Sequence, residues 1–281
     1  MKETIKTMNI RGRLVDVSRP MVMGILNVTP DSFYAGSRCD GEEAIRQRVR
    51  RIRHEGAAIL DVGGYSSRPG AGDVDPQEEW RRLQPAIEIS REEWPDAIIS
   101  VDTFRADVAR RAVEAGADII NDISGGDMDP GMFPAVAALH VPYILMHMQG
   151  TPKDMQQAPS YADVMSEVFR SLGERVEVLH EMGVADVILD PGFGFGKTME
   201  QNYRMMARLG EFRLLGCPLL VGVSRKSMIY RLLGCTPEQA LNGTTVLNVM
   251  ALMNGASILR VHDVREAVEA VKIYTQCWIS D

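Results

Sequence analysis

One pattern returns eight times along the 281-residue chain: a short apolar run ends in polar or glycine residues, and an amphipathic, helix-period stretch follows. Continuous apolar runs are typical of strands buried on both faces, and their alternation with helices predicts a parallel sheet covered by helices. Eight such units predict closure into a single (β/α)8 TIM barrel, which commonly takes about 250 residues. The predicted strands are 22–26, 59–62, 98–101, 119–120, 143–146, 187–189, 219–223 and 258–261.

Three further segments extend this prediction. Residues 8–10 and 14–17 flank a turn at Arg11–Gly12 and predict an N-terminal β-hairpin that caps the barrel base. A long amphipathic helix is expected at 163–182. The helix expected at 242–253 is more apolar than a solvent-facing helix needs, which indicates a subunit contact. No composition break divides the chain, so residues 1–281 form one predicted domain.

Composition and charge limit the classes of function. The net charge of −7 argues against a general nucleic-acid binder, because affinity for phosphate backbones depends on a positive surface. The four cysteines are scattered without a C-x-x-C pair, which argues against disulfides and fits a cytoplasmic protein. The histidines show no spacing typical of zinc ligands. Neither a membrane span nor a signal peptide is expected, because no apolar run is long enough.

Each predicted strand ends at a polar residue or runs into a polar, glycine-rich loop. In a barrel these ends surround one mouth, the face at which barrel enzymes carry out their chemistry. Polar residues also end strands simply as turn formers, which would suffice for one or two strands. For eight strands a binding site is the better interpretation. The polar ends lie at Asn27, Asp61, Asp102, Asn121–Asp122, His147, Asp190, Ser224–Ser227, Arg260 and His262.

One group of these residues suits the edge of a flat heterocycle. Carboxylates accept paired N–H groups from an amino-pyrimidine, and a lysine donates to a ring carbonyl or imine nitrogen. The group consists of Asp102, Asn121, Asp190 and Lys226, with Met146 and Phe195 available as apolar faces. The alternative is that Asp102 or Asp190 forms a buried ion pair, for example with Lys226.

A second group suits an anion. Asn27, Arg68, Arg260 and His262 supply an amide and cationic side chains, and the end of the last barrel strand often binds phosphate. Arg260 and His262 lie on the same side of their strand because side chains alternate. The alternative is a surface arginine beside a capping histidine. The stretch 192–198 resembles a nucleotide-binding phosphate loop, but Pro191 stands where its first glycine belongs, so nucleotide hydrolysis is not expected.

Eight motifs, in order and over nearly the whole chain, resemble those of the dihydropteroate synthases. Met23–Phe33 resembles the first signature of that family, and D-P-G-F-G-F-G-K at 190–197 matches a later motif; eight motifs in order are more specific than any one of them. The remaining motifs lie at 66–70, 101–103, 121–122, 145–150, 224–227 and 260–264.

The resemblance implies a homodimeric transferase of folate biosynthesis and a sulfonamide target. Such enzymes join 7,8-dihydropterin-6-ylmethyl diphosphate to 4-aminobenzoate and release diphosphate by a dissociative route that uses Mg²⁺. By the resemblance, the pterin is held by Asp102, Asn121, Met146, Asp190, Phe195, Gly222 and Lys226. The diphosphate is bound by Asn27, Arg68, Arg260 and His262, with Asn27 also contacting Mg²⁺. The aminobenzoate side is formed by Phe33, Ser67, Arg68, Pro69 and Ser224. The expected catalytic set is Asp102, Asp190, Lys226, Arg260 and His262.

One motif departs from the family pattern. Where the family commonly reads E-S-T-R-P-G, this chain has Tyr65 and Ser67 in place of the glutamate and the threonine. Serine keeps the hydroxyl and loses a methyl group, and no role is predicted for Tyr65. Two other functions remain open at this point: a pterin- or folate-dependent methyltransferase of the same barrel family, and a non-catalytic pterin-binding protein.

Overall fold

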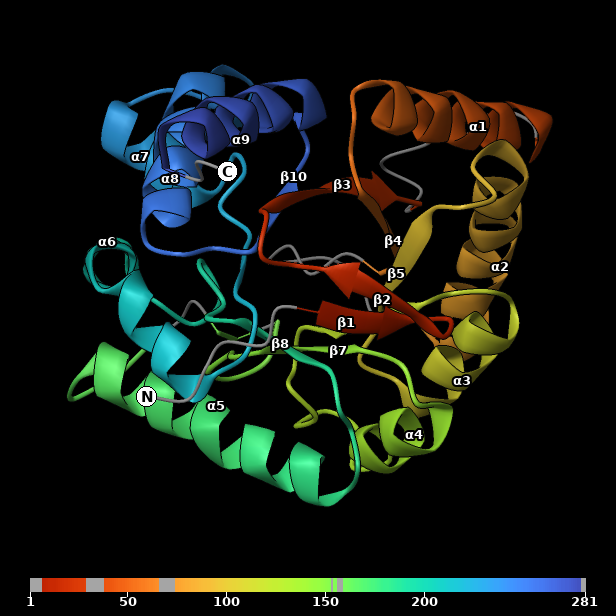
Figure 1. Cartoon of the computed structure of the whole chain (residues 1–281), viewed down its shortest axis with the longest axis horizontal. Helices are drawn as coiled ribbons and strands as arrows, with labels where there is room; N and C mark the ends of the chain where they lie inside the picture. The colour runs from red at the N-terminus through yellow and green to blue at the C-terminus, as the bar shows by residue number, and fades with distance from the viewer. Residues whose placement is uncertain (1–6, 29–37, 66–73, 153, 156–158, 279–281) are drawn as a thin grey trace.

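The computed structural model describes residues 7–28, 38–65, 74–152, 154–155 and 159–278. Eight parallel strands hydrogen-bond in the order β8-β7-β6-β5-β4-β3-β10-β9. A parallel bridge between Leu189 and Leu219 brings the two end strands together, so the sheet is a nearly closed barrel with its helices outside (Figure 1). The predicted barrel is therefore confirmed. The barrel strands are β3 (Met21–Asn27), β4 (Ile59–Gly63), β5 (Ile98–Asp102), β6 (Ile119–Asp122), β7 (Tyr143–Met146), β8 (Val187–Asp190), β9 (Leu220–Val221) and β10 (Ile258–Val261).

Helices follow the strands along the chain and cover the outside of the barrel. They are α1 (Arg38–His54), α2 (Pro76–Glu93), α3 (Ala106–Glu114), α4 (Met132–Leu139), α5 (Val164–Glu181), α6 (Met199–Ala207), α7 (Ser227–Leu233), α8 (Leu241–Met253) and α9 (Val264–Trp278), with short 3-10 helices at Leu209–Leu215 and Pro237–Gln239. None of these described helices has the length and apolar character needed to cross a bilayer.

The predicted strand at 219–223 is the one whose extent differs most from the structure. Only Leu220 and Val221 belong to β9, where they pair with Ile258 and Leu259 of β10. The chain leaves the sheet at Gly222 and enters a turn in which Lys226 N donates to the carbonyl of Val223 at 3.1 Å. This early exit is what carries Ser224 and Lys226 to the barrel mouth.

The inner face of the barrel begins with an apolar layer at its base. One buried residue from each of seven strands contributes, and the N-terminal hairpin, β1 (Thr7–Ile10) and β2 (Arg13–Asp16), packs onto this layer. Arg11 and Gly12, with φ of 51° and 78°, form its two-residue turn. The expected hairpin at the base is therefore present (Figure 1). The layer consists of Met23, Ile59, Ile119, Ile144, Ile188, Leu220 and Ile258, with Met8, Ile10 and Val17 from the hairpin and its flank.

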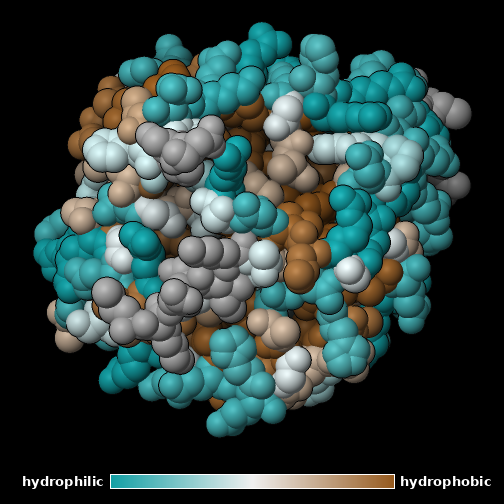
Figure 2. Space-filling view, in the orientation of Figure 1, coloured by the Kyte–Doolittle hydropathy of each residue, from teal (hydrophilic) through white to brown (hydrophobic). Residues whose placement is uncertain are grey.

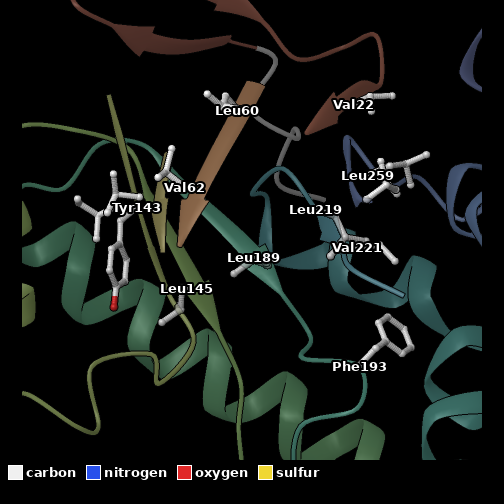
Figure 3. Close-up of a cluster of buried hydrophobic side chains, with 14 of the residues drawn as sticks. Val22, Leu60, Val62, Tyr143, Leu145, Leu189, Phe193, Leu219, Val221 and Leu259 are labelled. Atoms are coloured by element: carbon white, nitrogen blue, oxygen red, sulfur yellow. The ribbon is translucent and has the colours of Figure 1, made fainter. Parts of the chain in front are cut away.

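The outer faces of the strands form the larger core, between the sheet and the helices. Figure 3 shows Val22, Leu60 and Leu259 among the side chains that alternate with the inner layer and join this core. Both faces of each strand are therefore buried, which explains why the strands read as continuous apolar runs.

Close packing on this outer face generates a stability prediction at Gly24 of β3. A Cβ added there would lie 2.6 Å from Ile52 Cγ2 of α1 and 3.0 Å from Val264 Cγ2 of α9. Gly24→Ala is expected to lower the free energy of unfolding by about 1–3 kcal/mol in urea titrations, because the helices must move outward.

Gly41→Ala is the matched control, because Gly41 lies in α1 with nothing within 4 Å of an added Cβ. It should raise the free energy of unfolding by about 0.5–1 kcal/mol through helix propensity. Equal stabilities of the Gly24→Ala variant and the unchanged protein would contradict the packing account.

Candidate active site

A polar layer lies directly above the apolar base of the barrel. Side chains alternate along a strand, so the second residue after each inner apolar residue also points inward. Ile59 is thus followed by Asp61, Ile119 by Asn121 and Ile258 by Arg260. The same step leads to Met146 on β7, Asp190 on β8 and Gly222 after β9. Asp102 and His262 lie one further step of two along their strands, after Ser100 and Arg260. Seven of the residues predicted for the pterin and diphosphate sites thus belong to one mouth: Asp102, Asn121, Met146, Asp190, Gly222, Arg260 and His262.

Arg260 is the centre of an ionic network in this layer. Its Nε donates to Asp61 Oδ2 at 2.6 Å, and its Nη2 donates to Asp102 Oδ2 at 2.9 Å. Asn121 Nδ2 donates to the Asp61 carboxylate at 3.3 Å. Burial raises the pKa of Asp102 to about 7, with Arg260 opposing the rise and Asp61 adding to it. An ion pair at Asp102 is thus present, but its cation is Arg260 rather than Lys226.

Lys226 and Asp190 flank the other side of the mouth. Lys226 Nζ donates to the carbonyl of Phe193 and lies 4.6 Å from the centre of the Phe195 ring. Asp190 Oδ1 accepts from Gly192 N at 2.8 Å. Burial lowers the pKa of Lys226 to about 8, while Asp190 opposes that shift. Among the described residues neither Asp102 nor Asp190 forms an ion pair with Lys226. The Lys226 ammonium therefore donates to the neighbouring loop and keeps further N–H groups for a ligand in the mouth.

An apolar cluster lies beside these charges. Met146 and Phe195, the two residues predicted to flank a ring, are both members of it. Tyr65 also packs there, edge-on to Phe104 with ring centres 5.2 Å apart. The aromatic ring at position 65 therefore adds to the apolar wall of the site. The remaining members are Ile123, Met148 and Met155.

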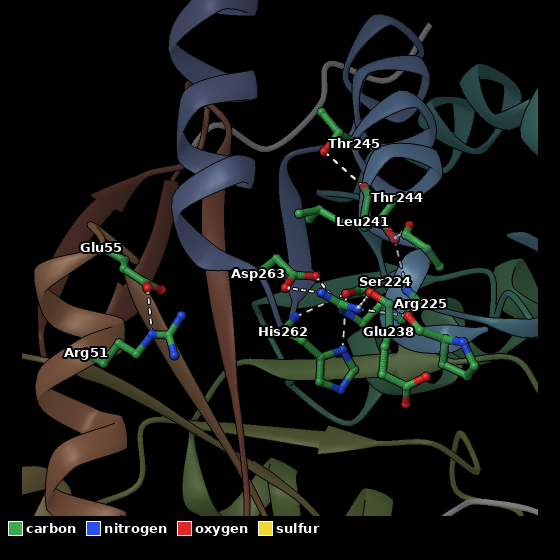
Figure 4. A network of polar contacts seen from close by, with 12 residues as sticks. Arg51, Glu55, Ser224, Arg225, Glu238, Leu241, Thr244, Thr245, His262 and Asp263 are labelled. Atoms are coloured by element: carbon green, nitrogen blue, oxygen red, sulfur yellow. Dashed lines mark hydrogen bonds and ion pairs between the residues drawn. The ribbon is translucent and has the colours of Figure 1, made fainter. Parts of the chain in front are cut away.

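Ser224 and His262 meet where β9 and β10 end. His262 Nδ1 lies 3.1 Å from Ser224 Oγ, and the backbone N–H of His262 donates to the same oxygen at 3.2 Å. Figure 4 shows this pair beside Arg225, whose guanidinium binds both Asp263 carboxylate oxygens at 2.8 Å. Burial, and secondarily the charge of Arg260, lowers the pKa of His262 to about 4. His262 is therefore a neutral imidazole near pH 7, whereas the sequence suggested a second cation.

Lys197 has a role that the sequence did not predict. It is buried, and its Nζ donates to the carbonyls of Gly192 and Phe195 at 3.0 Å and of His147 at 3.3 Å. Gly192, at φ 72°, lies so close to His147 that an added Cβ would be 1.9 Å from its carbonyl oxygen. The lysine that made this stretch resemble a phosphate-binding loop therefore holds the loop itself together, and so positions Asp190 and Phe195.

The comparisons with known proteins agree with this geometry. A family model described as "Pterin binding enzyme" matches residues 23–262. The dihydropteroate synthase of Escherichia coli K12 is 46% identical over 265 residues, which cover 94% of this chain and 93% of that protein. That of Synechocystis sp. is 43% identical, covering 92% and 91%. This chain belongs to the dihydropteroate synthases.

Solved structures of the family match the fold closely. A Yersinia pestis dihydropteroate synthase, described as a sulfonamide drug complex, has a TM-score of 0.91 and 43% identity, covering 98% of this chain and all of that one. A Xanthomonas albilineans dihydropteroate synthase, described with 4-aminobenzoic acid, has a TM-score of 0.91 and 42% identity, covering 99% and 100%. These relatives favour a synthase over the methyltransferase and non-catalytic alternatives.

Several predicted site residues lie outside the described part of the chain. These residues are Phe33, Ser67, Arg68 and Pro69, so most of the predicted aminobenzoate side remains a prediction. Asn27 ends β3, and its Oδ1 would lie 3.3 Å from a Cβ added at Gly63. The described residues contain no group of three acidic, histidine or cysteine side chains that could hold a metal by themselves.

Two residues with clear contacts in the mouth received no predicted role. Asp61 was recognised as a strand end, and its spacing of two from Ile59 would have placed it inside the barrel. Lys197 carried no comparable signal, because its partners, three backbone carbonyls and the Nδ1 atom of His147, come from two separate strand ends.

Proposed function

We propose that this chain, a transferase of class EC 2.5.1.15, condenses 7,8-dihydropterin-6-ylmethyl diphosphate with 4-aminobenzoate. The products are 7,8-dihydropteroate and diphosphate, and the pathway is folate biosynthesis in the cytoplasm. The observation that carries the proposal is one barrel mouth in which Asp102, Asn121, Asp190 and Lys226 lie beside Arg260. Acceptors for an amino-pyrimidine edge and a cation for an anion are thus combined in a single site.

The pterin is assigned to the half of the mouth that contains Asp190 and Asn121. Ionised Asp102 and Asp190 accept ring and amino N–H groups, while Lys226 donates to the ring carbonyl or imine nitrogen. Met146 and Phe195 cover the ring faces, and their membership of one apolar cluster supports this. Gly222 leaves room between Arg260 and Lys226, because an added Cβ would lie 3.8 Å from Arg260 Cβ and 4.0 Å from Lys226 Nζ.

The diphosphate is assigned to Arg260, His262 and Asn27, together with Arg68. Neutral His262 donates one hydrogen bond to a phosphate oxygen, and an adjacent anion raises the pKa of its ring. Asn27 would hold Mg²⁺ through its amide oxygen, which fits the preference of Mg²⁺ for few protein ligands. The bound ion supplies charge stabilisation to the leaving diphosphate.

The reaction breaks the C–O bond between the pterin methylene and the diphosphate. The bonding electrons leave with the diphosphate, where Arg260 stabilises the growing negative charge. The pterin ring delocalises the positive charge left on the methylene, with Asp102 and Asp190 as nearby anions. The neutral arylamine nitrogen then forms the C–N bond and loses a proton to solvent. No side chain has to act as a strong base, which is consistent with a dissociative route.

The aminobenzoate is assigned to the side of the mouth that contains Ser224. The hydroxyl of Ser224 is anchored by His262, so it is fixed relative to the diphosphate side. Phe33, Ser67, Arg68 and Pro69 are proposed to complete this side, and sulfonamides are expected to compete there. This assignment relies on the motif resemblance and on relatives described with 4-aminobenzoic acid and a sulfonamide drug.

A homodimer is proposed to form through α7 and α8. Val246, Met250 and Met253 are 52%, 39% and 61% exposed and lie on one face of α8, at spacings of four and three residues. Leu232 and Leu233 of α7 are 56% and 55% exposed. Figure 2 shows apolar atoms gathered at the upper left, over these helices. A contiguous exposed apolar patch of this kind is typical of a subunit contact.

Product formation tests the central proposal. With the pterin diphosphate, 4-aminobenzoate and Mg²⁺, the purified protein should form dihydropteroate and release diphosphate in equal amounts. Lys226→Ala should lower turnover at least tenfold, about 1.4 kcal/mol of transition-state stabilisation. Excess EDTA should suppress the reaction and added Mg²⁺ should restore it. Folded protein that binds the pterin diphosphate without releasing diphosphate would instead indicate a non-catalytic binder.

The pH dependence of turnover follows from the shifted pKa values of Asp102 and Lys226. Asp102 presents two acceptor oxygens to paired N–H groups only when it is ionised, so kcat/KM for the pterin diphosphate should rise with pH through a pKa of about 7. Lys226 carries its charge only when protonated, so kcat/KM should fall above a pKa of about 8. The acid limb should disappear in Asp102→Asn. An acid limb near pH 4 in the unchanged protein would contradict the burial argument.

Oligomeric state tests the proposed dimer. Light scattering coupled to size-exclusion chromatography should give twice the chain mass of 31.1 kDa. Met250→Glu should shift the protein toward the monomer, since a charge would be buried in the contact. Leu214→Glu is the control, because Leu214 is 56% exposed outside these helices. A monomeric unchanged protein, or a dimer unaffected by Met250→Glu, would contradict the assignment.

A further inference from the structure

Asp61 is a fully buried carboxylate in the polar layer of the mouth. Its side chain is 0% exposed, so it offers no surface to a bound substrate. It nevertheless contacts two elements of the site: Arg260 Nε donates to it at 2.6 Å, and Asn121 Nδ2 donates to its two oxygens at 3.3 and 3.4 Å. Any effect of Asp61 on the reaction must therefore pass through one of these neighbours.

The two carboxylates that bind Arg260 differ in their access to the mouth. The Asp102 side chain is 18% exposed, whereas the Asp61 side chain is completely enclosed. Asp102 can therefore redirect its oxygens toward a ligand, at the cost of its contact with Arg260 Nη2. Asp61 keeps its contact with Nε, and Asn121 fixes the orientation of its carboxylate.

We propose that Asp61 is a positioning residue, which holds the Arg260 guanidinium in place while the Asp102 carboxylate accepts hydrogen bonds from the pterin. The inference rests on the proposed function, because it takes the pterin diphosphate as the ligand. It assigns different roles to the two carboxylates that bind Arg260: the partly exposed Asp102 binds the ligand, and the enclosed Asp61 positions the arginine.

The charge of Asp61 matters as much as its shape. With Asp61 neutral, Asp102 becomes the only carboxylate on Arg260. Releasing Asp102 to the pterin then leaves no carboxylate to hold the guanidinium in its orientation toward the diphosphate. The Kd of the pterin diphosphate then rises, although the substitution changes no atom that contacts the ligand. Removing one partner of a buried ion pair also destabilises a fold, so the test has to separate positioning of Arg260 from general stability.

Binding of the pterin diphosphate, measured by calorimetry without 4-aminobenzoate, tests the inference. Asp61→Asn keeps the side-chain volume and removes the charge, and it should raise the Kd at least tenfold. The KM for 4-aminobenzoate, measured at a saturating concentration of the pterin diphosphate, should stay within twofold. Asp118→Asn is the matched control, because Asp118 is 3% exposed and pairs with Arg91 outside the mouth. It should lower the melting temperature and leave the Kd unchanged.

A double-mutant cycle with Arg260 separates positioning from general stability. In an Arg260→Gln background, Asp61→Asn should change the Kd less than threefold, because the residue it positions is gone. If the Arg260→Gln variant does not fold, Arg260→Lys replaces it as the background of the cycle. An equal tenfold loss in both backgrounds, or an unchanged Kd in Asp61→Asn alone, would overturn the inference.

Failure of the proposed function has a different signature. A protein that binds the pterin diphosphate but forms no dihydropteroate would contradict the proposed reaction, while the cycle on Kd would still decide the role of Asp61. An unchanged protein with no affinity for the pterin diphosphate would overturn both proposals.

Discussion

The active site depends on the two-residue alternation of side chains along a β-strand, which closure of the barrel turns into alternation between its inside and its outside. Along each strand one residue enters the outer core and the next points into the barrel. The inner residues form an apolar layer at the base, covered by the hairpin, and the next inner residues form the polar layer of the mouth. Asp61, Asn121 and Arg260 therefore meet, although they come from three different strands and lie far apart in sequence.

The charged side chains of this layer are partly removed from water, and this desolvation shifts their pKa values. Burial raises the pKa of Asp102 to about 7 and lowers that of Lys226 to about 8. Asp102 is ionised above its pKa and Lys226 is protonated below its own, so the two groups are predominantly charged together only between about pH 7 and 8. Arg260 remains charged throughout, because Asp61 and Asp102 more than offset the effect of burial on its pKa.

The loops that follow the strands are held by contacts of two kinds. Lys197 satisfies backbone carbonyls from the ends of β7 and β8, which joins Asp190 and Phe195 to one rigid loop. Arg225 binds Asp263 as well as the carbonyls of Pro237 and Glu238, which secures the turn that carries Ser224 and Lys226. In both cases a basic side chain outside the ligand-facing set determines where the ligand-facing residues lie.

The sequence by itself determined the barrel, its hairpin and most members of the mouth. Apolar periodicity and strand-end polarity are local signals, and a strand's inner residues follow from its own alternation. Only the tertiary structure decided the pairing: Arg260 with Asp61 and Asp102, His262 as a neutral partner of Ser224, and Lys197 inside its own loop. Hydrogen-bond geometry and burial arise between residues distant in sequence, so no local pattern specifies which cation meets which carboxylate or how far a pKa shifts.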